Sequence, residues 1–227
     1  LASGAGAIVL DVKTGSGALM HTLEDSIALA KAMVDIGAQA GKPILALVTG
    51  MEQPLGTHVG NALEVKEAID ILAGRAGGDL LRMKRALESG AGLEKLKEMI
   101  AAQGGDAGVC DDVTRLPQAK YLVPVPAPHD GYVADMDTTA IGYCAQDLGA
   151  GRKQKTDAID PAVGLVMDVR IGDFVKQGDP LATLHLNRME LAEGAIARMQ
   201  QAVRLTSEKP ATPPLVYAAV SPEGVAR

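Results

Sequence analysis

The chain has 227 residues, of which 47% are hydrophobic, and a formal net charge of −6 at neutral pH. This is enough apolar sequence for a hydrophobic core in one large domain or two smaller ones. Basic residues are interspersed with acids and aromatic residues make up only 2%, which argues against a nucleic-acid-binding surface. No apolar run reaches the roughly 20 residues of a membrane span, and residues 1–12 lack a signal-peptide pattern, so we expect a cytoplasmic protein with no membrane partner.

The first part of the chain has the pattern of a parallel α/β unit. Residues 7–12 (AIVLDV) and 43–50 (PILALVTG) are short apolar runs typical of strands that are covered on both faces. Thr22 and Asn61 are each followed three residues later by an acid, and an amphipathic stripe then begins, so both are predicted to cap helices. Strand, helix, strand and helix in this order predict a mixed or parallel sheet with helices packed on it.

The pattern changes in the second part of the chain. Residues 80–103 predict two short helices divided by Gly-Ala-Gly, whereas residues 121–137 and 163–186 alternate apolar and polar side chains between turns. A final helical stretch and a last apolar run follow. We therefore expect an α/β domain over residues 1–115, and a smaller α+β domain with a barrel-like β-hairpin region over residues 116–227.

Several familiar site patterns are not met. The glycine loop after the first strand (TGSGALM) lacks a dinucleotide fingerprint because Met20 stands where a third glycine is needed. Such a loop still lies where open α/β sheets bind ligands. Cys110 and Cys144 have no metal or CxxC spacing, so we expect two reduced thiols. The hairpin before His185 has no lysine at its tip, which argues against a biotinyl or lipoyl carrier.

One acid in the stretch EQPLGTHVGNALEVKEA has no evident local role. On the helix predicted there, Lys66 and Asp70 form a pair one turn apart, which leaves Glu67 without an assigned partner. Gly56 and Gly60 loosen the backbone just before this helix. The stretch is therefore predicted to bring carbonyl oxygens and one carboxylate to a common point.

The segments LDVKTGSGALM, EQPLGTHVGNALEVKEAIDIL, IDPAVG and GDPLATLH resemble, in this order, the thymidine and pyrimidine-nucleoside phosphorylases. The resemblance implies a homodimeric pentosyltransferase that cleaves thymidine- or uridine-type nucleosides with inorganic phosphate. In that family the phosphate-binding and base-binding residues precede the strand that begins here. The resemblance thus implies a missing N-terminal half, no catalytic residue in this chain, and no activity of the chain alone.

The same resemblance assigns four residues. Leu19 stands where the family often has a phenylalanine beside the substrate, so the resemblance implies a substrate-binding apolar wall. Some family members bind potassium through two main-chain carbonyls and a glutamate that match Leu55, His58 and Glu67. Carbonyl oxygens with one carboxylate suit a weakly hydrated monovalent cation. The alternative is a non-catalytic α/β binding or regulatory protein that retains the fold without the active site.

Overall fold

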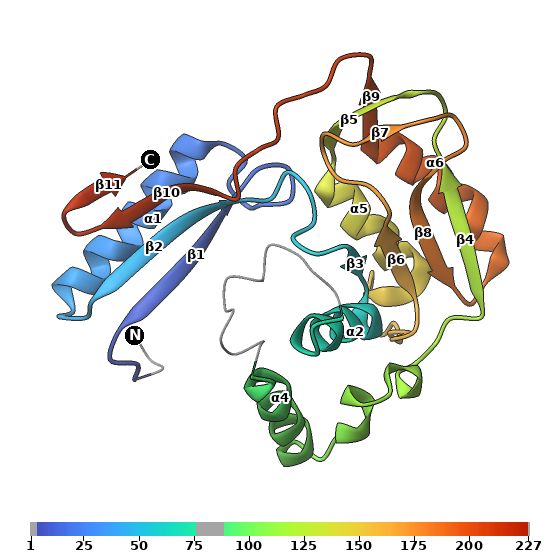
Figure 1. Cartoon of the computed structure of the whole chain (residues 1–227). Helices are drawn as coiled ribbons and strands as arrows, with labels where there is room; N and C mark the ends of the chain where they lie inside the picture. Colours follow the sequence, from blue (N-terminus) through green and yellow to red (C-terminus); the bar gives the residue numbers. More distant parts are fainter. Residues whose placement is uncertain (1–3, 76–88, 227) are drawn as a thin grey trace.

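A computed structural model describes residues 4–75 and 89–226. They form two lobes (Figure 1). The first lobe holds β1 (Ile8–Thr14), α1 (Leu23–Gln39), β2 (Ile44–Gly50), β10 (Val216–Ser221) and β11 (Gly224–Ala226). The second lobe holds β3 (His58–Val59), α2 (Asn61–Leu72), β4 (Tyr121–Pro126), β5 (Gly131–Met136), α5 (Thr138–Ala145), β6 (Gly164–Met167), β7 (Phe174–Val175), β8 (Pro180–Leu186), α6 (Ala192–Ala202) and β9 (Val203–Thr206). Between α2 and β4, α4 (Ala91–Ala102) is followed by 3₁₀ turns at Ala107–Cys110 and Val113–Arg115; further single turns lie at Gln146–Ala150 and Met189–Leu191.

The first lobe contains the predicted β-α-β unit. Strands β1 and β2 pair in parallel from Ile8 opposite Ile44 to Thr14 opposite Gly50, and α1 forms the crossover between them. The Thr22 cap is confirmed, because its Oγ1 accepts a hydrogen bond from the backbone N–H of Asp25 at 3.2 Å. A small apolar core lies between α1 and the sheet, made of Val12, Ala30, Val34, Ile44, Ala46, Val48, Ala218 and Val220.

The prediction that the first two strands are covered on both faces is wrong for the described residues. Val9 is 68% exposed and Leu45 is also exposed, because α1 packs on one face of this sheet and β1 is its edge strand. The C-terminal strand β10 pairs antiparallel with β2, with Ala219 opposite Leu47. The end of the chain therefore lies in the same sheet as its beginning, while the domain division near residue 115 stays a prediction.

The second lobe confirms the predicted antiparallel β structure. Its strands form a four-stranded sheet in the order β3-β6-β8-β4 and a three-stranded sheet in the order β7-β5-β9, and every pairing in them is antiparallel. The barrel-like arrangement was not found, because in the described part of the chain both sheets remain open. The edge strands β3 and β7 have only two residues each and are too short to continue the hydrogen-bond ladder around a closed barrel.

The helices of the second lobe agree with the sequence in part. Helix α4 begins at Ala91, inside the Gly-Ala-Gly stretch that was predicted to divide two helices, whereas the helix predicted before that stretch lies outside the described residues. The Asn61 cap is wrong: α2 begins at Asn61, whose side-chain amide donates instead to the carbonyl of Ala150 at 2.8 Å. Glu64 keeps half of the capping pattern, because its carboxylate accepts from the N–H of Gly60 at 3.3 Å.

The larger hydrophobic core lies in the second lobe, between its two sheets and helices α5 and α6. Cys144 belongs to this core, and Cys110 is buried near α4; both are free thiols, as predicted. Burial raises the pKa of Cys144 to about 11, so this thiol is protonated at neutral pH. Among the described helices, none combines the length and the apolar character needed to cross a bilayer.

Candidate functional site

A pocket of about 510 Å³ lies where the carboxyl ends of β1 and β2 meet α2 and α5. We call it the junction pocket. Its lining residues include Gly17, Met51, Val59, Ala68, Thr138 and Ile141. The three predicted cation ligands Leu55, His58 and Glu67 also line it. Leu19, the predicted substrate contact, does not line this pocket and is 86% exposed at the surface.

Glu67 has a local structural role that the sequence did not reveal. Its carboxylate accepts hydrogen bonds from the N–H and the hydroxyl of Thr57, at 2.7 and 2.8 Å, and from the N–H of His58 at 3.4 Å. Burial raises the pKa of Glu67, but the hydrogen bonds from Thr57 and the adjacent His58 outweigh it, so the net pKa lies below the ordinary value. A Cβ at Gly56 would lie 2.2 Å from a carboxylate oxygen of Glu67, so a larger residue there would displace this carboxylate from its hydrogen bonds.

The same segment is held from its other side by Arg170, which follows β6. Its guanidinium donates to the carbonyls of Pro54, Leu55 and Gly56, at 2.6, 3.3 and 2.9 Å respectively. We call residues 53–57 the crossing segment, because they carry the chain from β2 in the first lobe to β3 in the second. Sequence reasoning missed Arg170, since no local spacing connects an arginine beside a Gly-Asp turn with a loop more than a hundred residues away.

The glycine loop after β1 is attached to the start of α5. Ser16 donates its hydroxyl proton to the carbonyl of Met136 at 2.9 Å and accepts from the N–H of Thr138 at 3.2 Å, while Thr139 donates to the Ser16 carbonyl at 2.5 Å. A Cβ on Gly17 would lie 2.7 Å from the Thr138 methyl group. The loop that carries the predicted substrate contact is therefore positioned by the second lobe.

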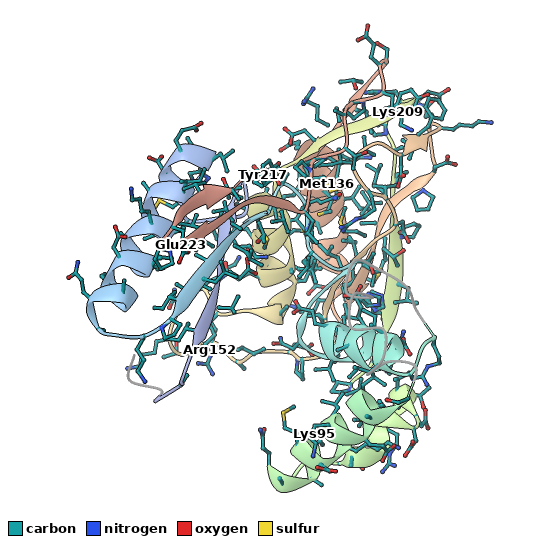
Figure 2. The ribbon with its side chains drawn as sticks, turned by 60° about the vertical axis from the view of Figure 1, so that its left-hand side comes forward. Lys95, Met136, Arg152, Lys209, Tyr217 and Glu223 are labelled. Atoms are coloured by element: carbon teal, nitrogen blue, oxygen red, sulfur yellow. The ribbon has the colours of Figure 1, made fainter. Side chains whose placement is uncertain are left out.

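A further contact holds the start of the connection between the lobes. Tyr217 on β10 donates its phenolic proton to Glu52, at the start of the connection after β2, at 2.8 Å. Burial and this carboxylate raise the pKa of Tyr217 to about 12, so the phenol stays protonated. Figure 2 labels Tyr217 and Met136 near the middle of the molecule, where the lobes meet, and Lys209 on the connection that leads to β10.

Replacing Ser16 by alanine should lower the free energy of unfolding by about 1–3 kcal/mol, because the Met136 carbonyl and the Thr138 N–H both lose a partly buried partner. Urea denaturation of the purified chain measures this difference. The control is Ser221→Ala, which removes a hydroxyl bonded to nearby Glu223 on the surface and should change stability by less than about 0.5 kcal/mol. Equal losses in the two variants would contradict the attachment of the loop.

The described residues contain no group of three or more histidine, cysteine, aspartate or glutamate side chains that could hold a metal ion. This finding concerns clusters of such side chains only. It does not address a site made of main-chain carbonyls and one carboxylate. The chemistry offered at the junction is instead that of oxygen ligands, a fixed guanidinium and apolar walls.

Comparison with known proteins gives the relationships of the chain. Residues 132–206 match the pyrimidine nucleoside phosphorylase C-terminal domain. The pyrimidine-nucleoside phosphorylase of Geobacillus stearothermophilus is 42% identical over 97% of this chain and 57% of its own length. That of Bacillus subtilis (strain 168) is also 42% identical, over 97% of this chain and 56% of its own. The chain is homologous to the pyrimidine-nucleoside phosphorylases along almost its whole length.

The chain aligns with the C-terminal half of these phosphorylases and spans little more than half of their length. A Staphylococcus aureus (strain bovine RF122 / ET3-1) phosphorylase gives the same result, with 45% identity over 84% of this chain and 50% of its own length. The resemblance predicted from the sequence motifs is thus confirmed. The part matched to the C-terminal domain carries Arg170, Met136, Thr138 and Thr139, which hold the crossing segment and the glycine loop of the first lobe.

Proposed function

We propose that the chain is the C-terminal portion of a pyrimidine-nucleoside phosphorylase. Such an enzyme is a pentosyltransferase that cleaves thymidine- or uridine-type nucleosides with inorganic phosphate, giving free base and a pentose 1-phosphate. The observation that carries the proposal is 42% identity to a named phosphorylase along 97% of the chain. The proposal includes the division into domains 1–115 and 116–227, a homodimer in the cytoplasm, and an N-terminal half that supplies the catalytic residues.

Within this proposal, Leu19 contributes an apolar wall to the nucleoside site. It lies on the glycine loop at the carboxyl end of β1, which is the edge where open α/β sheets bind their ligands. Its side chain is 86% exposed in the described structure, so it is accessible to a substrate. Ser16 and Gly17 attach the same loop to α5, which supports a defined position for this contact.

We also propose that the carbonyls of Leu55 and His58 and the carboxylate of Glu67 hold a potassium ion in the complete enzyme. All three residues line the junction pocket, and oxygen ligands with a single charge suit a monovalent cation. The Leu55 carbonyl also accepts from Arg170, but a carbonyl oxygen has two lone pairs and can accept twice. This capacity supports a site in which the Leu55 carbonyl is shared between the ion and Arg170.

A chimeric enzyme tests the proposed function. The chain is joined to the N-terminal part of the Geobacillus stearothermophilus phosphorylase, in place of the 57% of that protein with which it aligns. We expect phosphate-dependent release of thymine or uracil by the chimera. We expect none by the 227-residue chain alone, because phosphate and base must be positioned together for the reaction.

The same experiment separates the alternative function. A chimera that folds, binds nucleoside and yet shows no phosphorolysis beside an active parent would support a binding or regulatory protein that retains the fold without the chemistry. Circular dichroism and size-exclusion chromatography of the chimera establish that it is folded and report its oligomeric state. Turnover by the chain alone, free of host enzyme, would contradict the assignment of catalysis to the N-terminal half.

A further inference from the structure

The crossing segment lies between two opposite charges. The carbonyls of Pro54, Leu55 and Gly56 accept hydrogen bonds from the guanidinium of Arg170. The N–H groups that follow, of Thr57 and His58, donate to the carboxylate of Glu67. Carbonyl oxygens carry partial negative charge and N–H groups partial positive charge. The carbonyls therefore face the positive guanidinium, and the N–H groups face the negative carboxylate. Hydrogen bonds to charged groups are the stronger ones.

The geometry at Arg170 depends on the planar shape of its side chain. One nitrogen, Nη1, donates to the carbonyls of Pro54 and Gly56, and the second, Nη2, donates to that of Leu55 between them. Three consecutive carbonyls are thus bound by one rigid fork. A lysine ammonium is a point charge on a flexible stem and cannot reproduce this arrangement.

Arg170 is itself held in place by the turn in which it lies. Its backbone N–H donates to the carboxylate of Asp173 at 2.8 Å, and the next N–H, of Ile171, donates to the side chain of Gln53 at 3.0 Å. The turn between β6 and β7 therefore contacts four consecutive residues of the crossing segment, Gln53 to Gly56. The turn thus holds the crossing segment at several points and does not touch it at a single surface residue.

We infer that Arg170 is a positioning residue that acts as the built-in cation of the crossing segment. It holds the connection between the lobes from the side of the second lobe, and thereby the junction pocket to which that connection contributes three residues. This inference rests on the proposed function in one respect: a potassium ion would share the Leu55 carbonyl with Arg170. The positive guanidinium then lowers the affinity of the site for potassium, because like charges repel.

Backbone hydrogen exchange of the purified 227-residue chain tests the inference. In Arg170→Gln, exchange in the peptide that covers residues 53–60 should be about tenfold faster than in the unchanged chain, because three carbonyls lose their donor and the segment opens more often. Arg170→Lys should give a smaller increase, about threefold, because the charge remains but the fork is lost. Exchange in α1, which packs within the first lobe, should not change.

The matched control is Arg204→Gln, which removes the same charge from an exposed position of the second lobe, 3.9 Å from Asp135. It should leave exchange in residues 53–60 within about twofold of the unchanged chain. If circular dichroism shows that Arg170→Gln is unfolded, the inference is tested with Arg170→Lys alone. Unchanged exchange in the folded Arg170 variants, or an equal rise in Arg204→Gln, would overturn the inference.

Potassium chloride compared with choline chloride, at equal ionic strength, separates the two proposals. Protection of residues 53–60 that is lost in Arg170→Gln and restored by potassium supports both Arg170 as the built-in cation and the proposed ion site. Protection that is lost and not restored supports the role of Arg170 and counts against the ion site. If protection does not depend on Arg170 but rises with potassium in the unchanged chain, the inference about Arg170 is wrong and the proposed ion site is supported.

Discussion

Replacing Gly164 by alanine is expected to destabilise the protein by about 3 kcal/mol or more, because the new methyl group would meet main-chain atoms. A Cβ at this position would lie 2.2 Å from the carbonyl oxygen of Val59 and 2.9 Å from the Cα of Gly60. The backbone of Gly164 also has a φ of +153°, which side-chain-bearing residues rarely adopt. Relief of the contact requires β3 to separate from β6.

The control for this variant is Gly142→Ala in helix α5. A Cβ there meets nothing within 4 Å, and alanine is favoured over glycine inside a helix by about 0.8–1.0 kcal/mol. Urea or thermal unfolding of both variants should therefore give opposite signs. If Gly164→Ala unfolds like the unchanged chain, the close approach of β3 and β6 is not as described.

The contact at Gly164 explains two glycines of the family motifs. Gly60, in the segment THVGNALEVKEA, has a φ of +149°, and a Cβ on it would lie 2.6 Å from the carbonyl oxygen of Val163. Gly60 and Gly164 thus face each other where α2 meets β6. The sequence suggested that Gly60 loosens a loop around a cation, whereas the structure shows a close contact between two backbones.

Local signals predicted the first lobe well. The apolar runs of β1 and β2 and the Thr22 cap depend on residues that are neighbours in the sequence, and each is found where the pattern placed it. The place of β10 could not be predicted in this way. Its apolar run indicates a strand, but nothing in that run specifies antiparallel pairing with β2 at the opposite end of the chain.

The candidate site could also be predicted only in part from the sequence. The resemblance to the phosphorylases assigned Leu55, His58 and Glu67 to one cation site, and the three residues do line one pocket. The partners that hold them came from elsewhere in the chain or from the main chain itself. The sequence showed no partner for Glu67 because its hydrogen-bond donors are mainly backbone N–H groups. Every residue except proline carries such a group, and no sequence pattern distinguishes one from another.

The second large effect is expected for Glu67→Gln, which should lower the free energy of unfolding at pH 7 by about 1–3 kcal/mol. Glutamine keeps the size of the side chain, but it replaces a charged acceptor of three hydrogen bonds by a neutral amide with one oxygen. One of the donors to Glu67, on Thr57 or His58, is then left without its acceptor. Urea unfolding at several pH values measures the loss.

The pH dependence of this loss follows from the lowered pKa of Glu67. A carboxylate with a lower pKa in the folded state than in the unfolded state stabilises the fold above its unfolded pKa, near the ordinary value of 4.5. That contribution is lost as the pH falls through the lower, folded pKa. The stability difference between the unchanged chain and Glu67→Gln should therefore be largest near neutral pH and shrink below pH 4.5. A difference that stays constant down to pH 3 would contradict a charged role for this side chain.

The same variant tests the proposed ion in the active chimera, with His58→Ala as its matched control. Both changes alter a side chain that lines the junction pocket, but the proposed ligand is the carboxylate at Glu67 and the main-chain carbonyl at His58. Activation by potassium, measured against choline at equal ionic strength, should weaken in Glu67→Gln and persist in His58→Ala. The reverse result would show that the imidazole, which lies 3.5 Å from the Glu67 carboxylate, has the role that we assign to the carboxylate. Because alanine retains the carbonyl at position 58, loss of the potassium response in that variant cannot be explained by the main chain, and the proposed ligand set would be wrong.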